Sequence, residues 1–406
     1  MDCYAEAESK DIQFFHYCYD YVVVIPVCNE ASDFLENVFS LITDECLIVL
    51  VVNSPIGNEK WQTSNQFLID NLRNKSKSTT QVTNTIEHLR FESFHDVLLV
   101  DRNSSGFQIN PKQGVGLARK IGCDIALKLY VLGSIKSPWV FSTDADVILP
   151  CDYFSQIQFD EKKFSAIVLD FKHITDDKYL QNIQFSYDFK MRYYLAGIQF
   201  AQVGYDYIPL GSTLIASMEC YAKVRGFPKK NAAEDFYLLN KLAKVLPIKH
   251  FEKSCTIQIQ ARLSNRVPFG TGPALQKIAD LNSTQHYLYY HPKCFIYLKK
   301  WKLFLDSLWQ KSGLVIQSPK EVVLKQLYDF FNCSQVFEKS KNQITNKIRW
   351  QQFIHQWFDA FRILKAVHFV DKKFQRLNYK ELLKDDTFGK VTNSNLNQFI
   401  KENDTF

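Results

Sequence analysis

Two carboxylates stand one residue apart in the stretch WVFSTDADVILPCDYF, residues 139–154. They are Asp144 and Asp146, and the apolar run before them has the composition of a buried strand. Carboxylates this close repel each other unless a cation lies near them. Mg²⁺ and Mn²⁺ prefer oxygen ligands and are often held by one or two carboxylates together with substrate phosphates. The pair therefore predicts a site for a metal-bound diphosphate, and the alternative is a turn in which Asp caps backbone groups.

The first half of the chain alternates apolar runs with amphipathic segments. The runs at 21–28, 46–55, 95–103 and 138–146 predict strands, and 30–42 and 114–130 predict helices. This alternation is typical of an α/β fold with a mostly parallel sheet flanked by helices. Ligands bind such sheets beyond the carboxyl ends of the strands. Because each of these strands ends in small or polar residues, we expect those ends to line one crevice.

The second half changes in character along its length. Segments 163–171 and 255–264 predict strands, and 233–246 predicts a helix that begins with acids. Beyond about residue 295 aromatic residues and lysines interleave, which predicts a helical extension at 291–406. The aromatic stripe is the set Trp350, Phe353, Ile354, Trp357, Phe358, Phe361 and Leu364, which share one helical face. It either packs inward or contacts an anionic membrane peripherally.

Composition restricts the class of protein. The chain has 406 residues, of which 46% are hydrophobic, and a net charge of +6, which permits phosphate binding without requiring nucleic acid. We expect no nucleic-acid partner.

The first residues do not resemble a signal peptide, and no apolar run reaches the roughly 18 residues that span a bilayer. The ten scattered cysteines predict free thiols. We therefore expect a cytoplasmic protein that could lie at the inner face of a membrane.

Four segments occur in the order and spacing found in a known enzyme family. VVVIPVCNE, GVGLARKIGCDIAL, WVFSTDADVILPCDYF and AAEDFYLL together resemble family-two glycosyltransferases with the A-type, Rossmann-like fold. The resemblance covers roughly residues 20–245. It implies a nucleotide-sugar donor, a divalent metal, Mn²⁺ or Mg²⁺, and transfer of the sugar to an acceptor hydroxyl. On this reading residues 1–290 form the catalytic domain.

The resemblance assigns roles to particular residues. It implies that Pro26, Asn29 and Glu30 contact the nucleotide base and ribose. It also implies that Arg119, near the start of a helix, faces the nucleotide. Asp144 and Asp146 match a D-x-D pair that holds donor and metal, and the second acid usually binds the metal directly. Gly211 and Ser212 match a loop that approaches the acceptor. Glu234 and Asp235 match an E-D pair, whose Asp is the general base in inverting members.

Two features depart from the family or extend beyond its motifs. The family commonly has acids after its second strand, where this chain has VVNSP with Asn53. Asn53 would contact the donor in place of those acids, which leaves the identity of the donor's base open. Asp101 could supply ribose or base contacts or simply form a turn. The segment ARLSNRVPFGTGPAL, residues 261–275, predicts a lid-like loop in which Ser264 and Arg266 are site residues, and the guanidinium of Arg266 suits the donor diphosphate or a carboxylated acceptor. An ordinary surface loop is an equal alternative.

The predicted reaction is inverting transfer with Asp235 as base. The stretch KKNAAEDFYLLNKL places this acid near a helix N-terminus, where the helix dipole would keep it ionised. The alternatives are a retaining transferase of the same fold and a non-catalytic relative that binds nucleotide sugars or glycans. A nucleotidyltransferase fits less well, because no glycine-rich loop follows the first strand. The acceptor, whether glycan, lipid or small molecule, is not identified by the sequence.

Overall fold

The chain divides into two compact units. The computed structural model describes residues 2–92, 94–155, 160, 162–263, 271–281 and 284–403. The first unit is Met1–Asp177 with Pro209–Pro273, and the second is Lys178–Ile208 with Ala274–Phe406. The functional division expected from the sequence, between 1–290 and 291–406, stays a prediction.

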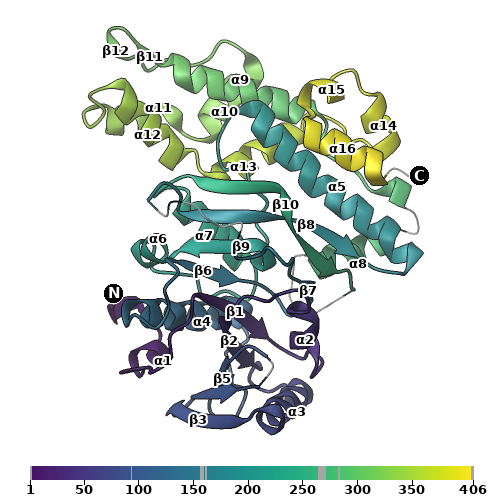
Figure 1. Ribbon diagram of the computed structural model, residues 1–406. Helices are drawn as coiled ribbons and strands as arrows, with labels where there is room; N and C mark the ends of the chain where they lie inside the picture. The colour runs from purple at the N-terminus through teal and green to yellow at the C-terminus, as the bar shows by residue number, and fades with distance from the viewer. Residues whose placement is uncertain are drawn as a thin grey trace. The chain divides into compact units, whose positions relative to one another are not determined.

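The first unit contains the strands and helices of the α/β fold (Figure 1). Its strands are β1 (Tyr21–Val27), β2 (Cys46–Asn53), β3 (Ser78–Thr83), β4 (Ile86–Arg90), β5 (Val97–Arg102), β6 (Trp139–Ser142), β7 (Val147–Ile148), β8 (Ala166–Ile174), β9 (Leu214–Ser217) and β10 (Ile248–Gln260). Its helices are α1 (Ala7–Lys10), α2 (Phe34–Val38), α3 (Glu59–Lys75), α4 (Gly114–Val131), α6 (Met218–Lys223) and α7 (Glu234–Leu242), with the 3₁₀ turns η1 (Asp2–Tyr4) and η2 (Gly211–Thr213).

The described strands of this unit form one sheet in the order β3-β4-β5-β2-β1-β6-β9-β8-β10-β7. Strands β5, β2, β1 and β6 are parallel neighbours, as are β8 and β10, and the remaining neighbours are antiparallel. The residues of β2 are buried throughout, as in a strand covered on both faces. The predicted α/β fold with a mostly parallel sheet is confirmed, whereas the β3–β4 hairpin and α3 were not predicted.

Helix α4 packs against the parallel strands through a glycine (Figure 1). A Cβ at Gly122 would lie 2.3 Å from Val24 Cγ1 and 3.2 Å from Val51 Cγ2, so only a glycine lets the helix approach β1 and β2 this closely. The observed helix matches the predicted 114–130 segment. The predicted helix at 30–42 is shorter, because the chain leaves β1 through Asn29 at φ 57°, a left-handed conformation, and α2 begins only at Phe34.

The second unit is largely helical. Its elements are α5 (Lys178–Ala201), α8 (Thr271–Ala279, which begins at the unit boundary), η3 (Thr284–His286), α9 (Lys293–Ser307), β11 (Trp309–Gln310), β12 (Gly313–Leu314), α10 (Val322–Phe330), α11 (Cys333–Lys341), α12 (Lys347–Trp357), α13 (Ala360–Asp371), α14 (Tyr379–Lys384), α15 (Phe388–Val391) and α16 (Ser394–Asn403). Figure 1 shows α5 beside α9 and α16, and α5 contacts each of them. The prediction that the chain is mainly helical beyond residue 291 is therefore confirmed.

The aromatic stripe lies on two helices instead of one. Helix α12 ends at Trp357, and Asp359 caps α13 by accepting a hydrogen bond from the Arg362 amide at 3.2 Å. Trp350 is buried, and its indole N–H donates to the Leu305 carbonyl at 3.1 Å. Ile354 and Phe358 are buried, and the remaining members of the stripe are half-buried. The stripe therefore contributes to the core of the helical unit.

Two further expectations concern single residue types and long helices. All ten cysteines are free thiols, as predicted. Within the described part of the chain, no helix is both long enough and apolar enough to cross a membrane.

Vesicle flotation distinguishes the two alternatives for the aromatic stripe, which are packing within the protein and peripheral contact with a membrane. We expect the full chain to remain at the bottom of a density gradient with vesicles rich in phosphatidylserine, because the apolar side chains that would enter the bilayer are already packed. Neutral vesicles are the control. Flotation with the anionic vesicles alone would contradict this expectation and favour the membrane interpretation.

Candidate functional site

The carboxyl ends of β1, β2, β5 and β6 lie at one edge of the sheet. The register pairs Val27 with Val52 and Val52 with Asp101, and it places Ser142 beside Val24. The segments that follow these strands therefore begin next to one another. Pro26 is buried within β1 opposite Val51, one residue before that strand ends.

Arg119 joins acids from two distant segments. This arginine of α4 is 3% exposed, and its Nε donates to Glu234 Oε1 at 2.9 Å. Its Nη2 donates to Asp144 Oδ1 at 2.5 Å, and its Nη1 donates to the Ser142 hydroxyl at 2.9 Å and the Thr143 carbonyl at 3.3 Å. Although burial opposes ionisation, the charges of Asp144 and Glu234 raise the pKa of Arg119 above its usual value. The guanidinium is a permanent cation between the first D-x-D acid and the E-D pair.

The turn η2 closes over this guanidinium. A Cβ at Gly211 would lie 2.2 Å from Arg119 Nη2, so the backbone of the turn lies directly against the arginine. The Thr143 hydroxyl donates to the Ser212 carbonyl at 2.9 Å and fixes the turn to the end of β6. Ser212 is itself buried. Both residues that the sequence assigned to an acceptor loop thus lie beside the D-x-D segment.

The second D-x-D acid belongs to a different cluster. Arg262, two residues after β10, donates to both oxygens of Glu30 at 2.8 and 3.0 Å and forms an ion pair with Asp146 Oδ2 at 2.8 Å. Burial and the charge of Asp144 raise the pKa of Asp146 to about 6. The pKa of Glu30 is also raised by burial, despite the opposing charge of Arg262. The acids at this edge are crowded, and a guanidinium faces two of them.

Asp235 is the second residue of α7, next to Glu234. The preceding residue, Ala233, has φ 57°, a left-handed conformation that turns the chain sharply into the helix. The Asp235 carboxylate accepts a hydrogen bond from the Phe236 amide at 2.6 Å. Burial and the charge of Glu234 raise the pKa of Asp235 to about 7. The sequence predicted that the helix dipole would keep Asp235 ionised. The raised pKa contradicts this prediction, because desolvation and the like charge of Glu234 outweigh the effect of the dipole.

An asparagine that the sequence did not single out joins β1 to β2. The buried Asn65 side chain, on α3, accepts from the Asn29 amide at 2.8 Å and donates to the Asn53 carbonyl at 2.9 Å. Asn65 thereby fixes two of the predicted donor residues through their backbones. Nothing in the sequence marked it, since α3 was not predicted. Arg262 could have been noticed, because it is a cation near the end of the predicted strand 255–264, whereas the observed strand β10 ends earlier, at Gln260.

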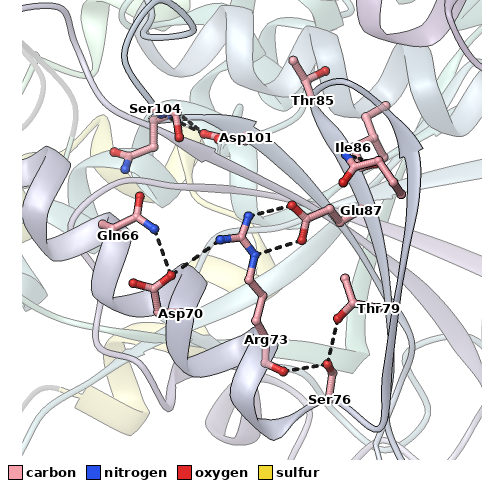
Figure 2. A network of polar contacts seen from close by, with 12 residues as sticks. Gln66, Asp70, Arg73, Ser76, Thr79, Thr85, Ile86, Glu87, Asp101 and Ser104 are labelled. Atoms are coloured by element: carbon pink, nitrogen blue, oxygen red, sulfur yellow. Dashed lines mark hydrogen bonds and ion pairs between the residues drawn. The ribbon is translucent and has the colours of Figure 1, made fainter.

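Asp101 lies near the end of β5, and its carboxylate caps the turn that follows the strand. Its Oδ1 accepts hydrogen bonds from the amides of Asn103 and Ser104, each at 2.8 Å (Figure 2). These hydrogen bonds agree with the turn role that the sequence analysis gave as one alternative for Asp101. The other alternative, contact with the ribose or base of the donor, stays a prediction. Ser264 and Arg266 lie outside the described residues.

The D-x-D acids fit a divalent metal by donor chemistry. Both supply hard oxygen donors, and the pKa of Asp146 is raised by burial and by the charge of Asp144, which a bound cation would offset. Among the described residues, no group of three or more His, Cys, Asp or Glu side chains is placed to hold a metal.

The chain was compared with known proteins. No protein-family model and no curated protein matches it. Similar solved structures include Staphylococcus aureus TarS 1–349 with UDP-GlcNAc, at 14% identity and TM-score 0.37, over 86% of this chain and 81% of that one. They also include the mannosyltransferase PcManGT of Pyrobaculum calidifontis with GDP-Man and Mn²⁺, at 11% identity and TM-score 0.35, over 83% and 86%. GalNAc-T7 with UDP, GalNAc and Mn²⁺ has 10% identity and TM-score 0.33, over 80% and 57%.

The contact between Gly211 and Arg119 gives a direct test of this packing. Gly211→Ala should lower the free energy of unfolding by about 1–3 kcal/mol, because its Cβ would overlap a buried guanidinium that cannot move without breaking ion pairs. Urea denaturation measures the change. Gly389→Ala is the control, since a Cβ there meets no atom within 4 Å. Equal stability of both variants and the wild type would show that Arg119 relocates freely.

Proposed function

We propose that the chain is a metal-dependent glycosyltransferase that moves a sugar from a nucleotide-diphosphate donor to a hydroxyl acceptor, with inversion. The observation that carries the proposal is the buried Arg119 guanidinium, which joins Asp144 of D-x-D to Glu234 of E-D at 2.5 and 2.9 Å. A donor-side acid pair and a base-side acid pair are the two parts that such a reaction requires. Both lie where α/β sheets bind ligands.

The donor diphosphate and its metal belong at the D-x-D acids. Asp146 and Asp144 would hold the metal, and a bound divalent cation would offset the charge that grows on the leaving diphosphate. Asn29, Glu30 and Asn53 line the neighbouring strand ends and would receive the nucleotide. Gly211 and Ser212 would face the acceptor.

Asp235 would take the proton from the acceptor hydroxyl as it attacks the anomeric carbon. A base is most effective when its pKa lies near the working pH, and the pKa of Asp235 is about 7. Direct attack needs no covalent intermediate, so the product would have the inverted configuration. Determination of the product's anomeric configuration by NMR distinguishes this from retaining transfer.

A donor panel tests the proposed activity. UDP-GlcNAc, GDP-mannose and UDP-GalNAc form a starting set, each assayed with Mn²⁺ for slow hydrolysis and for a rise in melting temperature. A donor that binds only the native state raises its apparent stability. Failure of every nucleotide sugar in a broad panel to do either would contradict the proposal.

Asp146→Asn tests the metal site. We expect this variant to lose transfer and to bind the nucleotide sugar more weakly in Mn²⁺, because an amide carries no charge to hold the cation. The fold should persist, as judged by circular dichroism. Asp152→Asn, a nearby acid outside the cluster, is the control. Full activity of Asp146→Asn, or undiminished wild-type activity in excess chelator, would exclude the metal role.

Asp235→Asn tests the base. Turnover should fall by about 10²–10⁴, the usual contribution of a positioned base, while donor affinity and melting temperature stay near wild type. The base acts when deprotonated, so wild-type turnover should decline as the pH falls below about 7. Nearly normal turnover of Asp235→Asn would leave this residue a helix-capping role, and a large fall in melting temperature would make the role structural.

A further inference from the structure

Arg262 is fixed beside Asp146 by the main chain. Strand β10 pairs with β7 so that Ile259 lies opposite Val147. The Gln260 amide then donates to the Asp146 carbonyl at 2.8 Å, and the Ala261 amide donates to the Ile174 carbonyl at 2.9 Å. These hydrogen bonds fix the backbone position from which Arg262 follows. The position of the Arg262 side chain at the cluster therefore follows from the pairing of the sheet.

The guanidinium faces the carboxylates of two segments. Its Nη1 and Nη2 each donate a hydrogen bond to one carboxylate oxygen of Glu30. The same Nη2 also forms the ion pair with Asp146 Oδ2. Although partial burial opposes ionisation, the charges of Asp146 and Glu30 raise the pKa of Arg262, so it stays charged. Such forked contacts are strong and geometrically specific. Arg262 thus serves as a cation at the acid proposed to hold the metal.

We propose that Arg262 is a built-in counter-ion which holds Glu30 and Asp146 in place in the metal-free protein and competes with a divalent cation at Asp146. This inference rests on the proposed function, because it concerns the same acid pair. Arginine and the metal require the same carboxylate, and two cations close to it repel each other. Arg262 is therefore a positioning residue that sets how tightly the site binds metal.

The test is Mn²⁺ binding without any sugar donor. Isothermal titration calorimetry on the full chain should show that Arg262→Gln binds Mn²⁺ on the order of tenfold more tightly than wild type, because a neighbouring positive charge has been removed. Arg262→Lys keeps the charge and should stay closer to wild type than Arg262→Gln. Asp146→Asn should bind Mn²⁺ weakly or not at all.

Arg73 provides a matched control. Its guanidinium forms the same kind of fork with Glu87, at 2.6 and 2.9 Å, on α3 and β4 (Figure 2). The side chains of Arg73 and Arg262 are each 36% exposed. Arg73→Gln should therefore resemble Arg262→Gln in the loss of stability without metal but bind Mn²⁺ as the wild type does. Added Mn²⁺ should raise the melting temperature of Arg262→Gln more than that of Arg73→Gln.

The outcomes separate this inference from the proposed function. Equal Mn²⁺ affinity of Arg262→Gln and wild type, weaker binding by Arg262→Gln, or no binding by any variant would overturn the competition. Tighter binding by Arg262→Gln that Asp146→Asn abolishes would support it. A protein that behaves in this way and yet accepts no nucleotide sugar would keep the inference and lose the proposed enzyme activity.

Discussion

The buried guanidinium of Arg119 is the interaction on which the candidate site depends. It extends from α4 with almost no access to solvent and contacts one acid just after the end of β6 and another at the start of α7. A charge in such a place is tolerated only when it is paired, and removal of one partner typically costs about 3–5 kcal/mol. The three segments are therefore coupled, and none of them can move without exposing or orphaning a charge.

Glycines make this arrangement possible at more than one point of contact. Gly122 brings α4 close enough to β1 and β2 for Arg119 to reach the end of β6, and Gly211 lets η2 lie against the guanidinium. At the first turn of α4, the Gly116 amide donates to the Lys230 carbonyl at 2.9 Å, and a Cβ there would overlap that oxygen. The segment before Glu234 is thus bound to the helix that carries Arg119. Backbone proximity, more than side-chain volume, positions the acids.

The two arginines of the site differ in how firmly they are held. Arg119 is enclosed and has partners on all three of its nitrogens, whereas Arg262 is 36% exposed and follows the end of a strand. Exchange of a guanidinium for another cation costs least where water can solvate the released group. The inner arginine is therefore suited to structure and the outer one to exchange. This contrast gives the acids a rigid side toward the proposed base and a responsive side toward the proposed metal.

The sequence by itself determined the features that local composition encodes. Apolar runs predicted β1, β2, β5 and β6, and the polar residues after them predicted which edge of the sheet would hold Asp144 and Asp146. Burial of a strand and the chemistry of its last residues both depend on neighbours within a few positions, so they can be read along the chain. The division of the aromatic stripe at Asp359 was missed, because a single capping residue outweighed the helical periodicity.

Tertiary structure decided which charges meet. Arg119 and Glu234 are 115 residues apart, and Arg262 and Glu30 are 232 apart. No local pattern encodes such pairs, because they depend on the order of strands in the sheet, in which β6 lies beside β1 and β10 pairs with β7. The pKa of Asp235 was decided in the same way, since the helix that would keep it ionised is local, whereas its burial comes from the packed fold. Sequence thus determined which acids stand at the edge of the sheet, and packing determined the cations and the solvent exposure that control their chemistry.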